Sequence, residues 1–318
     1  MKNDPIESAM ERLDGVDAHS AEGRSILQKA LEGKYSLVIA KAARIAGEAQ
    51  AFELAGPLAA AFARLLPRGS ERDKGCTALT DIARALVKLD YDDAELFRRG
   101  MKHVQMEAVW GGSVDVAPEL RAVCAMGLAN SRDPKKLQPM VELLADREWP
   151  ARAGALRAIT VVGTDSASLL LRYKALLGDK EPEVLSDCLA GLLALDGAEA
   201  LPVVAKLADS NEPEVREAAI LSLGASRRAD AIEWLKERFD QTAHLETKKY
   251  LVVALASSRT EAAMAFVLEL IREGTRSAAA MAISALSVYH NDRGLREEIV
   301  RAAESREDGM ALLREGKL

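Results

Sequence analysis

The stretch DSNEPEVREAAILSLG, which runs from Asp209 to Gly224, decides the fold of this chain. It places a proline before a run of helix-forming residues. Proline is tolerated at the start of a helix, because an N–H at that position would have no hydrogen-bond partner within the helix. Glu181-Pro182-Glu183-Val184 matches Glu212-Pro213-Glu214-Val215 at a distance of 31 residues. Pro118 and Pro150 extend the series at spacings of 32 residues. A fixed period of this length is typical of a repeat protein.

When the repeats are aligned, three equivalent positions are mostly apolar or small in every repeat, and we call each such set of residues a column. The columns follow one another at intervals of four residues, so they lie on one helical face. The first contains Leu120, Ala151, Val184, Val215, Thr247 and Ala278. The second, which holds mostly small residues, contains Cys124, Ala155, Cys188, Ala219, Leu251 and Ala282. The third contains Leu128, Ile159, Leu192, Leu223, Leu255 and Leu286. Small residues in the middle column allow neighbouring helices to approach closely.

A second helix pattern precedes each of these and repeats with the same period, at Leu137, Leu169, Leu201 and Ile232. Aromatic residues make up only 4% of the chain, and Ala and Leu dominate, which favours helices over strands. We therefore predict an all-α fold without a sheet. Its architecture is a right-handed α-solenoid of about eight antiparallel helix pairs that stack into a superhelix.

The order Asp, Pro, Val-Arg, Ala-Ala and Leu-Gly resembles a HEAT repeat of the short bacterial type found in bilin lyases. The family's Asp position is matched by Asp115, Asp146, Asp179 and Asp209. Its Arg position is matched by Arg121, Arg152 and Arg216, with Lys248 of the same charge. Leu185 and Ala279 depart from the pattern, so an Asp–Arg ladder is expected to be interrupted there. The resemblance is strongest over residues 115–225.

We expect one domain over residues 1–318, because no linker divides the repeats. Residues 24–293 form the repeats, residues 1–23 form an N-terminal cap with a loose start, and residues 294–318 form a C-terminal cap with a frayed end. Terminal repeats need a polar outer face, which fits the charged ends. The third repeat is longer than the others, and its excess around Val109–Val114 predicts an extended loop.

The composition excludes several classes of protein. A net charge of −6 does not fit a general nucleic-acid binder, which needs a basic surplus to neutralise phosphates. No apolar run is long enough to span a membrane, and the polar start of the chain predicts no secretory signal. The three cysteines form no CxxC pair and fit a reducing compartment. A cytoplasmic location is expected.

The sequence predicts no catalytic, cofactor-binding or metal-binding residue. HEAT-like deoxyhypusine hydroxylase carries His-Glu pairs as iron ligands, and none of the four histidines here precedes a glutamate. Cys124 and Cys188 occupy a column that holds alanine in other repeats, so we expect both to be small buried residues, as we do Cys76. The arginine column has two interpretations. It forms a phosphate-binding stripe, or its members bind the aspartates of the loops between helices, which the matching period favours.

The surface opposite the core predicts a partner site on the concave face. It comprises the residues two and six positions after each first-column residue, among them Ala122 and Ala153, and it is small, mixed and weakly charged. Trp110 either anchors a partner from its glycine-flanked loop or packs back on the core. The residues assigned to partner binding are Trp110, Met126, Arg157, Glu217, Leu221 and Lys249.

Two functions remain open. The first is a non-catalytic scaffold that binds a protein or peptide, without nucleic acid, membrane or cofactor. The second is a HEAT-like accessory enzyme, such as a bilin lyase subunit or an alkyl-DNA glycosylase. A bound chromophore would favour the lyase and excision of alkylated bases would favour the glycosylase. The sequence does not predict the oligomeric state.

Overall fold

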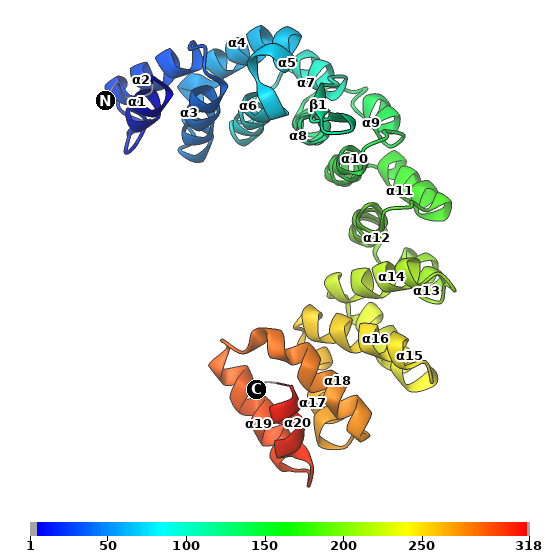
Figure 1. Cartoon of the computed structure of the whole chain (residues 1–318). Helices are drawn as coiled ribbons and strands as arrows, with labels where there is room; N and C mark the ends of the chain where they lie inside the picture. The colour runs from blue at the N-terminus through cyan, green and yellow to red at the C-terminus, as the bar shows by residue number, and fades with distance from the viewer. Residues whose placement is uncertain (1–4, 317–318) are drawn as a thin grey trace. The chain divides into compact units, whose positions relative to one another are not determined.

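A computed structural model describes residues 5–316 of the chain (Figure 1). Its contacts divide it into two compact units, Met1–Leu171 and Arg172–Leu318. The described residues of both units fold into helices joined by short turns, and a two-stranded sheet lies in the first unit. No helix among the described residues combines the length and the apolar character needed to cross a bilayer.

The first unit alternates first and second helices of each repeat. The second helices α3, α6, α8 and α10 pack against one another in a row, and α2, α4, α7 and α9 cover one side of that row (Figure 1). The elements are α1 Pro5–Glu11, α2 Ala21–Leu31, α3 Ser36–Glu48, η1 Phe52–Leu54, α4 Ala55–Leu65, η2 Leu66–Arg68, α5 Gly69–Arg72, η3 Lys74–Cys76, α6 Thr77–Lys88, α7 Ala94–Met101, β1 Met106–Val109, β2 Gly112–Asp115, α8 Pro118–Asn130, α9 Leu137–Leu143 and α10 Trp149–Val162.

The second unit follows the same rule, with α12, α14, α16 and α18 in one row and α13, α15 and α17 beside it (Figure 1). Helix α19 packs on α17, and α20 packs on α18 and α19. The boundary between the units falls inside α11 Asp165–Leu177. The other elements are α12 Pro182–Asp196, η4 Gly197–Glu199, α13 Leu201–Ala208, α14 Pro213–Ala225, α15 Ala229–Gln241, α16 Leu245–Ser258, α17 Glu261–Arg272, α18 Arg276–Leu286, η5 Ser287–Tyr289, α19 Arg293–Glu304 and α20 Gly309–Glu315.

The prolines and the apolar columns explain these helices. Helices α8, α10, α12 and α14 each carry a proline in the first two positions, as the repeat predicts. Every residue of the middle column and of the third column is 0% exposed, so these columns form the core between the two rows. Burial of a Leu or Ile side chain stabilises the folded state by about 1.5–3 kcal/mol, and the third column supplies one such side chain per repeat.

The predicted all-α solenoid of antiparallel helix pairs is confirmed. The expectation that no sheet is present is wrong at one place, because residues 106–115 form a β-hairpin where an extended loop was predicted. The assignment of residues 1–318 to one domain with two caps stays a prediction. Residues 1–4 and 317–318, on which the loose start and the frayed end partly fall, lie outside the described residues.

Candidate functional site

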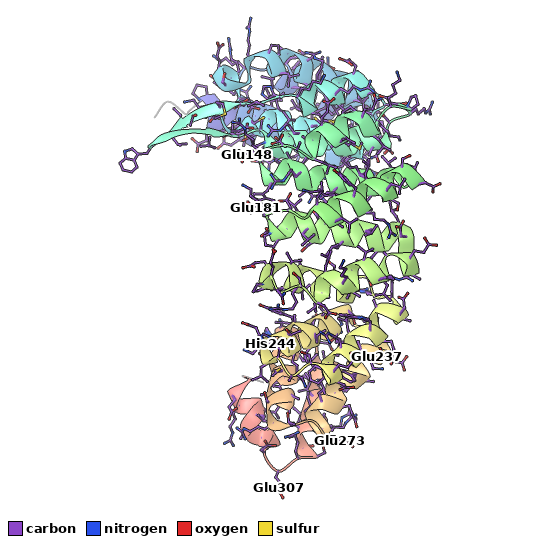
Figure 2. The ribbon with its side chains drawn as sticks, turned by 90° about the vertical axis from the view of Figure 1, so that its right-hand side faces the viewer. Glu148, Glu181, Glu237, His244, Glu273 and Glu307 are labelled. Carbon is purple, nitrogen blue, oxygen red and sulfur yellow. The ribbon has the colours of Figure 1, made fainter. Side chains whose placement is uncertain are left out.

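The hairpin is a narrow ribbon with a tryptophan at its tip. Strands β1 and β2 pair antiparallel, with Met106 opposite Asp115 and Val109 opposite Gly112, so the loop contains only Trp110 and Gly111. Gly111 has a φ of 92°, a left-handed conformation that favours glycine. The Trp110 side chain is 104% exposed, so it does not pack on the core. Figure 2 shows the hairpin leaving the first unit at the edge where Glu148 precedes α10.

Asp115 fixes one side of the hairpin base. Its Oδ1 accepts the N–H groups of Gln105 at 3.1 Å and of Ala117 at 3.0 Å. Its Oδ2 accepts a bond from Nη1 of Arg121 at 2.7 Å. Burial opposes ionisation of Asp115, but the two N–H groups and the guanidinium outweigh it and lower the pKa of this carboxyl. The ionised carboxylate therefore ties the hairpin to α8.

Gln105 and Glu107 fix the other side of the base. Gln105 is 2% exposed, and its Nε2 donates to the carbonyl of Asp73 at 2.8 Å and to Oε1 of Glu107 at 2.7 Å. The same Oε1 accepts the N–H of Gly75 at 2.8 Å. The hairpin is thereby bound to the turn that leads into α6.

Asp73 in turn organises the start of α6. Its carboxylate oxygens accept the N–H groups of Ala78 and Leu79 at 2.9 and 2.8 Å, which satisfies donors that lack partners at a helix N-terminus. Burial raises the pKa of Asp73, although these N–H groups act in the opposite direction. The hairpin base therefore rests on a buried polar network that ties it to α6 and α8.

Above this base the hairpin exposes apolar side chains. Val109 is 50% exposed and Met106 is 52% exposed, although each lies on a strand. Residues Ala108 to Val114 include no charged side chain. An exposed apolar tip on a rigid support is suited to insertion into an apolar pocket, because little conformational entropy remains to be lost on binding.

The other predicted residues of the first unit lie on the second helices. Arg157 on α10 is exposed and Met126 on α8 is half-buried. Ala122 and Ala153 were expected opposite the core, and this is wrong because both are buried. The cause is the close approach of α8 and α10, where a Cβ on Gly154 would meet the Cβ of Ala122. Of the two predicted positions on these helices, the one six residues along, Met126 and Arg157, remains accessible.

The predicted residues of the second unit differ in their availability. Leu221 and Glu217 on α14 are half-buried. Glu217 accepts a hydrogen bond from the Tyr250 hydroxyl of α16, and burial together with this carboxylate raises the pKa of Tyr250. Lys249 on α16 is exposed and lines a groove between α16 and α18. The structure thus places the six predicted residues in two separate sets, three in each unit.

The α16–α18 groove is the main feature that the sequence interpretation missed. It has a volume of about 560 Å³. Leu245, Val253 and Val288 line it and are 59%, 43% and 69% exposed. Val253 lies six positions after its first-column residue, as Leu221 does. This shared position was the signal in the sequence that could have indicated the groove. The full lining is Leu245, Lys249, Val253, Ser257, Ser277, Ala280, Met281, Ser284, Ala285, Val288 and Tyr289.

The arginine column serves the architecture. Arg121 is 2% exposed and bonds both the aspartate of its own loop and Asp146 of the next, with Nε and Nη2 at 2.8 and 2.9 Å from the two Asp146 oxygens. Arg152 is 6% exposed and donates to the carbonyls of Asp146 and Arg147. Asp209 pairs with Arg238, while Arg216 donates to the carbonyl of Ser210. The interpretation as loop-binding arginines is confirmed for Arg121.

The three cysteines are free and buried, as predicted. Burial raises the pKa of the Cys76 and Cys188 thiols to about 12 and raises that of Cys124 as well. These thiols are therefore neutral and inaccessible. Within the part of the chain that the structure describes, no three His, Cys, Asp or Glu side chains are grouped to hold a metal ion.

Comparison with known proteins gives one family match, to the model for HEAT repeats, over residues 169–256. No curated protein sequence matches the chain. Among solved structures, an engineered protein is 18% identical with a TM-score of 0.38, covering 98% of this chain and 93% of its own. The complex of CpcE and CpcF of phycocyanin lyase from Nostoc is 14% identical with a TM-score of 0.35, covering 92% and 93%. Human deoxyhypusine hydroxylase in complex with glycerol is 14% identical with a TM-score of 0.30, covering 90% and 98%.

Proposed function

We propose that this protein, whose chain contains HEAT repeats, is a non-catalytic scaffold that binds a protein partner. The observation that carries the proposal is the fully exposed indole of Trp110 on a hairpin whose base is held by buried hydrogen bonds. Tryptophan is enriched among residues that dominate binding energy, and a rigid loop on a repeat scaffold is a common site of function.

Side chains on the second helices of each unit add to the proposal. In the first unit the proposal includes Met126 and Arg157 together with Trp110. In the second unit it includes Glu217, Leu221 and Lys249. Solenoids present extended surfaces of this mixed character to protein ligands. The inert thiols support a role without covalent chemistry, and free cysteines fit a cytoplasmic location.

The test is quantitative affinity capture with the full chain and two variants. Trp110→Ala removes the exposed indole, and Phe52→Ala removes another exposed aromatic ring, 56% accessible, from the turn between α3 and α4. Truncation of a binding anchor costs about 2 kcal/mol or more, a loss of about 30-fold in affinity. We expect partners to be lost with Trp110→Ala and retained with Phe52→Ala. Equal capture by all three proteins would contradict the proposal.

A further inference from the structure

A cleft with an apolar floor and a positively charged rim lies at the N-terminal end of the first unit. Helices α1 and α2 both pack against α3 there (Figure 1), and residues of all three line the cleft, which has a volume of about 480 Å³. We propose that this cleft binds a small amphiphilic anion, an apolar molecule that carries one negatively charged head group. The inference goes beyond the proposed function and uses none of the residues assigned to partner binding.

The floor of the cleft is suited to an apolar ligand. Leu13 follows α1, Ile26 lies on α2 and Val38 lies on α3, and all three belong to the lining. Leu13 and Val38 are buried, so the floor is formed by the core of the unit. An alkyl or aromatic group that enters the cleft gains free energy by leaving water. A volume of about 480 Å³ lies within the range of small-molecule sites, roughly 300–1,000 Å³.

The rim determines the charge of the ligand. Among the described residues that line the cleft, Arg12, Lys29 and Lys34 carry a positive charge, and none carries a carboxylate. The Lys34 ammonium lies 4.9 Å from the ring centroid of Tyr35, which also belongs to the lining, so a cation–π contact holds this charge beside the cleft. Three cations around an apolar floor are complementary to a molecule with an apolar part and an anionic part.

These cations are available to a ligand. Two other cations on the same helices, Arg24 of α2 and Lys41 of α3, form ion pairs with carboxylates. In the part of the chain that the structure describes, no carboxylate pairs with Arg12, Lys29 or Lys34. An anionic head group can therefore accept charge-assisted hydrogen bonds at the rim without breaking an existing ion pair.

The C-terminal end of α2 does not oppose an anion. Carbonyls in the last turn of a helix carry partial negative charge, which would repel a negative head group. Arg64 of α4 compensates them, because its guanidinium donates to the carbonyls of Leu31, Glu32 and Gly33 at 2.6, 2.7 and 3.2 Å. Residues 24–76 contain nine Lys and Arg residues against five Asp and Glu residues, although the whole chain has a net charge of −6. The local charge therefore favours an anionic ligand.

Isothermal titration calorimetry of the full chain with dodecanoate tests the inference, at ligand concentrations from about 1 µM to about 500 µM. Dodecanoate joins one carboxylate to a long alkyl chain, and we expect it to bind saturably. Acetate lacks the alkyl chain, and dodecyl maltoside has the chain without the charge. Each should bind at least about 10-fold more weakly than dodecanoate, because each makes only one of the two kinds of contact.

A variant of the rim tests the role of the cations. Arg12→Gln, Lys29→Gln and Lys34→Gln combined remove the three positive charges from exposed positions, so the fold should be kept. We expect dodecanoate to bind this variant about 10-fold more weakly or worse, because hydrogen bonds to charged groups are lost.

Helix α19 supplies a control with the same change of net charge. Arg293, Arg296 and Arg301 are exposed there and line a hollow that also contains carboxylates. Replacement of these three by glutamine should leave the affinity for dodecanoate as in the parent. Equal weakening by both triple variants would mean that only the net charge matters, and would overturn the inference.

A variant of the floor tests the role of the cleft itself. Ala30→Leu, at a half-buried position of the lining, fills part of the volume without a change of charge and should weaken binding of dodecanoate by about 10-fold. Circular dichroism checks that the variant is folded, and Ala9→Leu on α1 replaces it if it is not.

Three results would overturn the inference. The parent binds no dodecanoate, the rim variant binds it as the parent does, or a hexaglutamate peptide binds the parent more tightly than dodecanoate, which would make the ligand an acidic peptide. Trp110→Ala should bind dodecanoate like the parent, because the hairpin takes no part in the lining. Loss of partner capture therefore leaves this inference standing, and loss of dodecanoate binding leaves the proposed function standing.

Discussion

Replacement of Arg121 by methionine should destabilise the first unit strongly. Arg121 is 2% exposed, and its guanidinium donates to Asp115, to both oxygens of Asp146 and to the carbonyl of His103. Methionine keeps the apolar stem and removes the charge, which leaves two carboxylates without their cation. Removal of one partner from a buried ion pair costs about 3–5 kcal/mol, and we expect a loss in this range.

Arg276 supplies the matched control. It also contacts two carboxylates, those of Asp308 at 3.3 Å and Glu315 at 2.7 Å, but its side chain is 56% exposed. Because water screens exposed pairs, Arg276→Met should cost about 1 kcal/mol or less. The difference between the two variants therefore measures the effect of burial rather than the number of ion pairs.

The effect of Arg121→Met should depend on pH. The pKa of Asp115 is lowered in the folded chain, so its stabilising contribution is present above the unfolded pKa of about 3.9 and is lost as pH falls through the folded pKa. Arg121 is one cause of that lowering. The cost of the substitution should accordingly shrink as pH falls from neutral through the folded pKa of Asp115, because protonation of that carboxyl removes the negative charge with which Arg121 pairs.

Urea unfolding followed by circular dichroism gives the free energy of unfolding of each variant. Hydrogen exchange locates the change, and we expect faster exchange at the amides of Gln105 and Ala117, which donate to Asp115. A cost for Arg121→Met no larger than that for Arg276→Met would refute the reasoning. So would a cost that is unchanged in acid.

Three further outcomes are expected. Gly154→Ala should lower the free energy of unfolding by about 1–3 kcal/mol, because the new Cβ would collide with α8. Gly56→Ala, which has open space around it, should change the free energy of unfolding by less than about 1 kcal/mol. Urea unfolding measures both. The thiols of Cys124 and Cys188 should react with a disulfide reagent at about pH 8 far more slowly than in urea, because burial raises their pKa; rapid labelling of the native chain would contradict this. Trp110→Ala should leave the free energy of unfolding within about 0.5 kcal/mol of the parent, and a larger loss would mean that the indole packs on the protein.

The helices could be predicted from the sequence because each repeat contains its own start signal and its own core residues. A proline such as Pro182 or Pro213 marks the first turn, and the small residue six positions after it, Cys188 or Ala219, is 0% exposed. Because the pattern recurs in every repeat, an ambiguous position in one repeat can be assigned from the equivalent positions in the others. Ala122 and Ala153, two positions along, were misassigned because periodicity does not show how closely helices approach, and Gly154 brings α8 and α10 together.

The hairpin and the groove were harder to predict because neither is periodic. The hairpin occurs in one repeat, and its short strands, four residues each, carry a weak signal. Gly111 at the second position of a two-residue loop was the clue that favours a tight turn over an extended loop. The groove depends on which of the faces of α16 and α18 stay uncovered, and this follows from packing rather than from the residues of either helix.

The position of the hairpin explains how one repeat accepts an insertion without losing its helices. Asp115, Asp146 and Asp179 each accept the N–H of the residue two positions later, at 3.0, 2.8 and 3.0 Å, so the three loops end in the same turn. The extra residues of the third repeat lie before Asp115, and the turn that starts α8 is therefore unchanged. Arg121 bonds this aspartate, and the same carboxylate accepts the N–H of Gln105 at the hairpin base. The aspartate that maintains the repeat thus also supports the hairpin that carries the exposed Trp110, which is why a change at Arg121 should reach the proposed binding surface as well as the core.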